Sequence, residues 1–275
     1  MTTSTLQPEA ISWVCATVRS RSAIELDVSK SYLIEARLAP VAKQNGFADI
    51  DELIQAVKAK RKVGLEAQLV EAMTTNETSF FRDLHPFETL RKTLFPEIRA
   101  RNAARKTLNI WSAACSTGQE IYSVAMHLQE HFPELPSWKV QLVGTDLSDE
   151  VLAKAKAAKF SQIEVNRGLP AALLVKNFQR QGMQWELRPE IRNMATFTKL
   201  NLIERWPVLP AMDIVFLRNV LIYFAPDVKR MILEKVRKVM APQGVLFLGA
   251  AETTMGLDNC LERIQTDNSV YYRMK

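Results

Sequence analysis

The sequence predicts an α/β fold built on a mostly parallel sheet, and two stretches of the 275-residue chain carry most of that prediction. Residues 108–120, LNIWSAACSTGQE, are an apolar run that ends in small residues and leads into an amphipathic helix. Residues 142–146, LVGTD, come about one strand–helix unit later and deliver Asp146 at the end of a second apolar strand. This order is typical of the ligand-binding edge of a nucleotide-type sheet, where N–H groups at a helix start and an acidic side chain meet.

The strand–helix alternation continues from residue 108 to the C-terminus. We expect strands at residues 108–114, 140–145, 196–199, 213–217 and 245–249, and helices at 119–131, 149–158 and 227–240. The last residues, ERIQTDNSVYYRMK, alternate around an Asp-Asn turn and predict a terminal hairpin. An antiparallel last strand on a parallel sheet distinguishes the methyltransferase variant of this Rossmann-like fold from a plain dinucleotide-binding domain.

Three further segments complete the predicted domain organisation. Residues 1–75 read as a small all-helical domain, in which Pro40 is expected to end or kink the second helix. Residues 76–107 form a connector, NETSFFRDLHPFETL, and a long helix; the methyltransferase-type domain spans 108–275. Within it, residues 161–193 are too long for a simple crossover and predict a small β subdomain.

Composition excludes several classes of protein. No apolar run reaches the ~18–20 residues of a membrane span, and the N-terminus lacks a signal-peptide layout. Three scattered cysteines and three histidines give no disulfide frame and no metal-ligand spacing, which indicates a cytoplasmic protein without a metal. The net charge of +6 allows an acidic partner. The basic clusters lack interleaved aromatic residues, so nucleic acid is not expected as a partner.

The turn after the first strand favours a cofactor that has a ribose but no phosphate. It holds one glycine, Gly118, where a dinucleotide fingerprint has three, and the chain has no phosphate-binding loop. S-adenosylmethionine fits this pattern, with Glu120 as a partner for its cationic end and Asp146 for its ribose. The alternative is that Glu120 favours a helix start and Asp146 caps the next helix. Cys115 in the same turn is expected to be a small packing residue, because no His–Asp set accompanies it.

Several motifs resemble the chemotaxis receptor methyltransferases, the CheR family. They are NETSFFR (76–82), WSAACSTGQEIYS (111–123), GTDLS (144–148), LNL (200–202) and RNVLIYF (218–224). The resemblance covers nearly the whole chain in order, and the combination of the first and last motifs is very specific. Two positions depart from the family pattern, Gln119 where a first Glu is usual and Ile121 where Pro is common.

The resemblance implies an S-adenosylmethionine-dependent glutamate O-methyltransferase that acts on chemoreceptor signalling helices, forming glutamyl methyl esters and S-adenosylhomocysteine. By motif, the residues expected to bind the cofactor are Asn76, Thr78 and Arg82, Glu120 at its amino group, Asp146 at its ribose, Asn201 and Leu202 beside its adenine, and Arg218 and Asn219, which would close the site.

The resemblance also implies a substrate surface. The family's basic N-terminal helix is thought to receive the receptor's methylation region, and Lys30, Arg37 and Lys43 match its positions. Their spacing alone favours an ordinary solvated helix face. Residues 161–193 resemble a β subdomain that docks a receptor C-terminal peptide in some members. Because the loop between Phe178 and Trp185 looks shorter here, no tight dependence on that peptide is expected.

Arg82 and Tyr223 are the expected catalytic residues. A glutamate side chain is already ionised at pH 7, so positioning matters more than a general base. Arg82 could orient the acceptor carboxylate, and Tyr223 could stack near the sulfonium or orient the substrate. Two alternatives remain open at this point: a methyltransferase for another substrate class, which lacks support from any N-P-P-Y-type motif, and a non-catalytic cofactor-binding signalling module.

Overall fold

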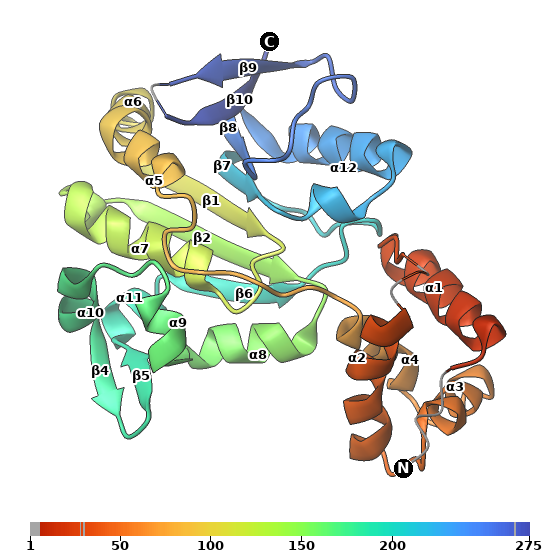
Figure 1. Cartoon of the computed structure of the whole chain (residues 1–275). Helices are drawn as coiled ribbons and strands as arrows, with labels where there is room; N and C mark the ends of the chain where they lie inside the picture. The colour runs from red at the N-terminus through yellow and green to blue at the C-terminus, as the bar shows by residue number, and fades with distance from the viewer. Residues whose placement is uncertain (1–5, 28, 30, 267) are drawn as a thin grey trace. The chain divides into compact units, whose positions relative to one another are not determined.

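The chain divides into two compact units, each with its own buried core. The computed structural model describes residues 6–27, 29, 31–266 and 268–275. One unit comprises Met1–Thr75 together with Tyr223–Val228, and the other comprises Asn76–Ile222 and Lys229–Lys275 (Figure 1). No helix among the described residues is long and apolar enough to cross a membrane.

The helical unit packs four amphipathic helices around a small core. Asp49 caps the third helix by accepting a hydrogen bond from the Glu52 N–H over 2.8 Å. Pro40 does not end the second helix, because it lies in the last turns, where few N–H···O=C bonds remain to be lost. The helices are α1 (Pro8–Ser22), α2 (Ser31–Gln44), α3 (Ile50–Lys58) and α4 (Leu65–Ala72).

The larger unit is built on a seven-stranded sheet with the order β6-β2-β1-β7-β8-β10-β9. The first five strands in that order run parallel, and β10 is antiparallel to both β8 and β9. This confirms the predicted methyltransferase-type sheet and its C-terminal hairpin. The strands are β1 (Thr107–Ala113), β2 (Lys139–Asp146), β6 (Ala195–Lys199), β7 (Met212–Leu217), β8 (Met240–Leu248), β9 (Leu261–Gln265) and β10 (Val270–Met274).

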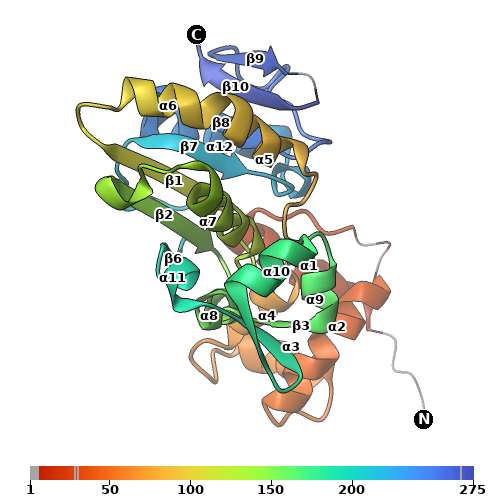
Figure 2. The same cartoon turned by 90° about the vertical axis from the view of Figure 1, so that its left-hand side faces the viewer.

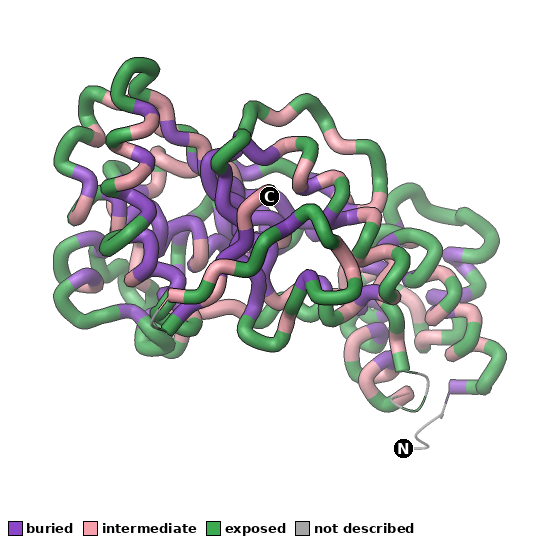
Figure 3. Tube along the Cα trace, turned by 90° about the horizontal axis from the view of Figure 1, so that it is seen from above, coloured by how far each residue is buried: buried purple, intermediate pink, exposed green. Residues whose placement is uncertain are grey.

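Helices cover both faces of this sheet. Figures 1 and 2 show α5, α6 and α7 on one face and α12 on the other. The central strands are buried on both sides, as Figure 3 shows, and Phe216 stacks between Phe87 and Phe247. The helices, with a π-helix η2 inside the first run, are α5 (His85–Thr89), η2 (Leu90–Leu94), α6 (Phe95–Arg101), α7 (Gln119–His131), α8 (Asp149–Ala157) and α12 (Pro226–Val239); short 3₁₀ turns are η3 (Leu135–Ser137) and η4 (Leu221–Tyr223).

A separate three-stranded antiparallel sheet, in the order β3-β5-β4, confirms the predicted β insertion. Its first strand begins two residues before the expected range. A capping box at Ser161 and Glu164 starts the helix that follows that strand. The elements are β3 (Lys159–Ser161), α9 (Gln162–Asn166), α10 (Ala171–Asn177), β4 (Phe178–Gln181), β5 (Gln184–Leu187) and α11 (Pro189–Arg192).

The two adjacent phenylalanines of the connector anchor it in two directions. Phe80 is fully buried and packs edge-to-face against Phe160 and Phe178, with ring centroids 5.0 and 5.7 Å apart. Phe81 packs against Phe87 of α5, with centroids 5.1 Å apart. The irregular segment is therefore held by aromatic packing rather than by a regular element, which keeps the residues after it in place.

A buried carboxylate ties the helical run before β1 to the start of β7. Asp213 accepts hydrogen bonds from the guanidinium groups of Arg101 and Arg105, each over 2.9 Å. It also accepts from the Asn102 side chain and from the Asn109 backbone N–H. Because every partner comes from the α6–β1 region, this one side chain sets where β1 enters the sheet.

His127 on α7 makes the stability of the larger unit dependent on pH. Burial among aromatic rings, with the nearby His131 and Arg91, lowers the pKa of His127 to about 4. The unfolded chain binds this proton near pH 6.5 and the folded chain does not, so stability is complete above that pH and falls as the pH drops toward 4. We expect a loss of about 2 kcal/mol between pH 7.5 and pH 5.

Urea unfolding of the wild type and of His127→Leu at the two pH values measures this loss. The variant lacks the titrating group, so its stability should change less over the interval by about 2 kcal/mol. If the stability of the two proteins depended on pH to the same extent, His127 would bind its proton equally well in the folded and the unfolded chain.

Candidate functional site

The predicted cofactor residues gather at the carboxyl ends of β1, β2, β6 and β7, in the larger unit. Ligands of open α/β sheets bind at this edge. The turn that follows β1 is held against the end of β2: the Ser116 N–H donates to Asp146 Oδ2 over 2.9 Å. The other oxygen, Oδ1, accepts from the Ser148 N–H over 3.1 Å. The Ser116 hydroxyl donates to the Asn76 carbonyl, which brings the connector to the same place.

A buried ion-pair cluster lies beside this turn. Arg218, at the end of β7, donates from Nη1 to Glu120 Oε2 over 2.8 Å and from Nη2 to Asp83 Oδ2 over 2.7 Å. Nη2 also donates to the Arg82 carbonyl. The second oxygen of Glu120 accepts from the Ser112 hydroxyl over 2.7 Å. The Arg218 side chain is only 1% exposed, so its charge depends on these partners.

Arg82 itself presents a less constrained guanidinium. Its Nη1 donates to the Glu77 carbonyl over 3.0 Å, and the side chain is half-buried, as is Thr78. The Glu77 carboxylate pairs with Arg167, whose hydrogen bond and charge lower the pKa of Glu77. The backbone carbonyl of Arg82 therefore belongs to the Arg218 cluster. Most N–H donors of the Arg82 guanidinium make no bond to a described residue.

The segment after β6, which the resemblance assigns to the adenine side, meets the end of β2. The Leu200 N–H donates to the Asp146 carbonyl over 2.9 Å, continuing the pairing of the two strands. Asn201 Oδ1 accepts from the Ile203 N–H, which closes a turn of the chain. Leu202 within this turn is buried. Asn201 and Leu202 thus lie next to Asp146 along the same sheet edge.

Glu252, which we had not predicted from the sequence, organises the loop that follows β7. Its oxygens accept from four backbone N–H groups, those of Asn219, Val220, Ile222 and Gly249, over 2.7–3.3 Å. A Cβ atom at Gly249 would lie 2.7 Å from the Glu252 carboxylate, so only glycine fits. Asn219 has a φ of 58°, a conformation that these bonds help to hold.

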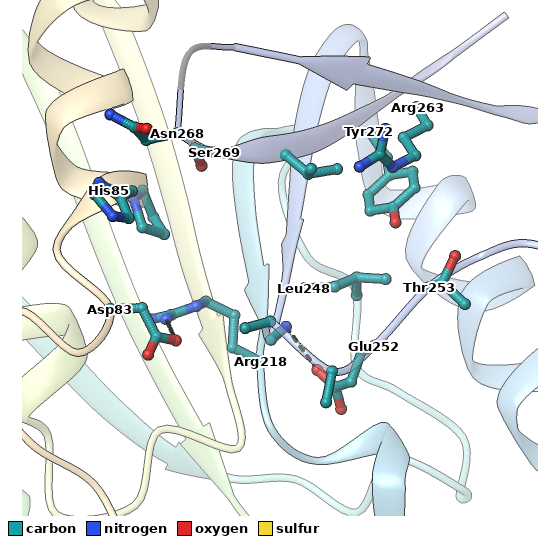
Figure 4. Close-up of a pocket in the computed structure, with 15 residues that line it drawn as sticks. Asp83, His85, Arg218, Leu248, Glu252, Thr253, Arg263, Asn268, Ser269 and Tyr272 are labelled. Atoms are coloured by element: carbon teal, nitrogen blue, oxygen red, sulfur yellow. Dashed lines mark hydrogen bonds and ion pairs between the residues drawn. The ribbon is translucent and has the colours of Figure 1, made fainter.

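A cavity of about 510 Å³ opens beside Arg218 at the carboxyl ends of β7 and β8. Figure 4 shows the Arg218 side chain reaching toward Asp83, with Glu252 folded back onto its own loop. The Arg218 Nε is buried and has no acceptor among the described residues. An oxygen atom brought by a ligand would supply the missing partner. The lining also includes His85, Arg263, Ser269 and Tyr272.

Tyr223, the second expected catalytic residue, groups with the helical unit. It ends η4, is half-buried, and its carbonyl accepts a hydrogen bond from the Glu25 N–H over 3.0 Å. Nothing in its surroundings tests a catalytic role, which stays a prediction.

The three residues of the predicted substrate surface differ in their surroundings. Arg37 donates from Nη1 to the carbonyls of Met73 and Thr74, over 2.8 and 3.0 Å, where it caps the end of α4. Lys43 is exposed and lines a cavity of about 350 Å³ in the helical unit. Lys30 lies outside the described residues.

Cys115 lies buried in the turn after β1. Burial, with the charges of Asp146 and Glu120, raises the pKa of the Cys115 thiol well above its usual range, so the thiol stays protonated and packs as a small residue. No group of three or more acidic, histidine or cysteine side chains that could hold a metal occurs in the described part of the chain.

The arrangement fits a cofactor with a cationic end and a ribose. Glu120, Arg218 and Asp83 together carry a net charge of −1, and Asp146 adds another negative charge nearby. Glu120 uses one acceptor site on each oxygen and a carboxylate offers about four, so it retains sites for an ammonium group. Asp146 is fixed at the carboxyl end of β2 by backbone N–H groups, at the sheet edge where ligands of this fold class bind.

Comparison with known proteins agrees with this geometry. Residues 76–270 match the family described as CheR methyltransferase, SAM binding domain, and residues 9–74 match its all-alpha domain. The chain is 40% identical to chemotaxis protein methyltransferase 1 of Pseudomonas aeruginosa, covering 92% of this chain and 93% of that protein. It is 34% identical to chemotaxis protein methyltransferase 1 of Vibrio cholerae over the full length of both chains.

Replacing Glu252 tests whether it holds the loop after β7. In Glu252→Gln one acceptor oxygen becomes a donor group, so backbone N–H groups of this loop lose their partner. We expect the free energy of unfolding to fall by about 1–3 kcal/mol. Glu262→Gln, an exposed change on β9, should alter stability by less than about 0.5 kcal/mol. Urea denaturation measures the free energy of unfolding of both variants. Equal losses in the two would show that Glu252 does not hold the loop.

Proposed function

The chain belongs to the CheR methyltransferase family, and on this premise we propose that it methylates glutamate side-chain carboxylates of chemoreceptors during chemotactic adaptation. The observation that carries the proposal is the acidic, ordered edge formed by Glu120, Arg218 and Asp146. The relatives' names place them in chemotaxis. The nature of the methylated group is inferred from the chemistry below.

We assign the cofactor-binding roles by the sheet edge on which each residue lies. Glu120 would bind the ammonium group, with Arg218 and Ser112 fixing its carboxylate. Asp146 would bind the ribose hydroxyls. The cofactor-side roles of Asn76, Thr78, Asn201, Leu202 and Asn219 rest on their motifs and on their position along this edge.

The proposed acceptor needs no general base. A glutamate side chain has a reference pKa of about 4.3, so it is a carboxylate at pH 7 and already nucleophilic. S-adenosylmethionine supplies a methyl group activated by its positively charged sulfonium. The protein's task is to bring a carboxylate oxygen in line with that methyl group, and positioning alone can lower a barrier by ~7–11 kcal/mol.

Arg82 is the proposed orienting residue for the acceptor. Its guanidinium is bonded to a single described carbonyl, which leaves a fork of donors suited to a carboxylate. Its backbone is fixed by the Arg218 bond, so the side chain extends from a rigid point. We propose Tyr223 as a second contact to the reacting groups, by ring or hydroxyl.

We propose a division of labour between domains. Residues 1–75 would recognise the methylation region of the receptor's signalling helices. Residues 76–107 would connect the two domains, and residues 108–275 would catalyse transfer of the methyl group. Of the three residues that the resemblance assigns to the receptor surface, Lys43 is exposed on α2 and is the one proposed to meet an acidic helix. Arg37 holds the end of α4 and would act by keeping the helical unit in shape. We further propose that residues 161–193 bind no receptor tail tightly.

The experiment that tests the function is transfer of a labelled methyl group from S-adenosylmethionine to chemoreceptor-containing membranes, followed by mild base. Release of the label as volatile methanol identifies a carboxyl methyl ester. Label that survives base would indicate N- or S-methylation and overturn the proposed reaction. Cofactor binding without transfer to any receptor would favour a non-catalytic module.

Arg82→Ala should lose turnover without losing the fold. We expect kcat to fall at least about 100-fold, since orientation of the acceptor is lost, while the unfolding free energy changes by less than about 1 kcal/mol. Arg99→Ala, which removes a surface ion pair with Glu134, serves as the matched control and should retain activity. Parallel losses of activity and stability in Arg82→Ala would indicate a structural role.

Lys43→Glu tests the proposed receptor surface. Charge reversal at an exposed position should raise KM for the receptor about tenfold and leave cofactor affinity unchanged. Arg37→Ala should instead lower the stability of the helical unit, because it leaves the carbonyls after α4 unpaired.

Receptors with and without their C-terminal tails should be methylated at similar rates. Strong dependence of the methylation rate on the tail would refute the proposal that residues 161–193 bind no receptor tail tightly.

A further inference from the structure

Lys235 on α12 makes contacts that neither the motifs nor the proposed chemistry explain. Its ammonium donates to three successive backbone carbonyls, those of Leu202, Ile203 and Glu204, over 3.2, 3.0 and 2.7 Å. A lysine has three N–H donors, so all of them are used on one turn of the chain. Bonds from a charged donor are roughly twice as strong as neutral ones.

Two indoles packed edge-to-face also hold this turn. Trp206 donates from Nε1 to the Leu202 carbonyl over 3.2 Å, and the Lys235 ammonium lies 5.4 Å from the centre of its ring. Trp206 packs edge-to-face on Trp111 of β1, with centroids 5.1 Å apart. Trp111 in turn donates to the Thr145 hydroxyl, one residue before Asp146.

These contacts place the Leu202 carbonyl between two donors from different elements. The Lys235 ammonium approaches from α12 and the Trp206 indole from the loop itself. The turn contains no regular secondary structure, so side chains must satisfy its carbonyl groups. Partial burial lowers the pKa of Lys235, and the charge of Glu204 opposes that shift.

We propose that Lys235 is a positioning residue for the cofactor: by clamping residues 202–204 it holds the Asn201–Leu202 turn in the shape that receives the adenine ring. The inference rests on the proposed assignment of that turn to the adenine side. Lys235 does not touch the cofactor. It acts through backbone carbonyls, so loss of its charge should weaken binding of the adenosine part and leave the methyl-transfer step unchanged.

The test compares Lys235→Met, which keeps the aliphatic stem, with Lys238→Met three residues further along α12. Lys238 is 70% exposed and pairs with Glu234 on the same helix, so its loss should not reach the turn. Calorimetry with S-adenosylhomocysteine and with adenosine should show Kd rising about tenfold for both ligands in Lys235→Met and unchanged in Lys238→Met. At saturating cofactor, kcat should stay within about twofold of wild type. Lys235→Arg, which retains the charge and the donors, should restore most of the affinity.

The outcomes separate this inference from the proposed function. Unchanged Kd in Lys235→Met overturns the inference and leaves the methyltransferase intact. A weaker S-adenosylhomocysteine complex with unchanged adenosine affinity also overturns it, because the defect would then lie at the amino-acid end. If the wild type binds neither ligand, both proposals fail. Should Lys235→Met not fold, Lys235→Gln, a neutral side chain with two donors, is measured instead against the same criteria.

Discussion

The buried guanidinium of Arg218 is the interaction on which the candidate site depends. It joins three segments that are far apart in sequence: the end of β7, the start of α7 through Glu120, and the connector through Asp83 and the Arg82 carbonyl. A charge this deeply buried is costly unless it is paired, and removing one partner of such a pair typically costs 3–5 kcal/mol. The connector that carries Arg82 is therefore held to the sheet edge by electrostatics as well as by its two phenylalanines.

The charge balance of that cluster explains its chemistry. Two carboxylates on one guanidinium leave a net negative charge around a buried arginine, with the Asp83 side chain partly open to water. A neutral pair would not attract a cationic ligand. Arg218 orients the Glu120 carboxylate, and Asp83 adds the second negative charge that makes the cluster acidic. A cofactor with an ammonium and a sulfonium complements this arrangement.

Sequence patterns predicted the features that depend on neighbouring residues in the chain. Strand ends at Asp146 and a helix start at Glu120 follow from hydrophobic periodicity, and the helix expected at 119–131 has the observed bounds Gln119–His131. Asp83 and Glu252 could not be found in this way, since their roles arise from partners 135 and 33 residues away. The one signal for Glu252 was Gly249, which directly follows β8, and a glycine does not say which side chain needs the space. Nor does spacing show that Arg37 is already engaged with backbone carbonyls.

The turn after β1 adopts its conformation with one glycine, because residues with side chains take up positive φ values. Ala114 and Ser116 have φ values of 61° and 50°, which cost about 1 kcal/mol or more each for residues with a side chain. The cost is offset because the Ser116 N–H meets Asp146 and its hydroxyl meets the Asn76 carbonyl. A phosphate would have required bare N–H groups and close backbone approach, hence more glycines. Here the N–H group donates to a protein carboxylate instead, so it is not free for a phosphate. The strained turn therefore fixes an acidic side chain at the sheet edge, which suits the ribose hydroxyls that we propose Asp146 binds and does not suit a phosphate.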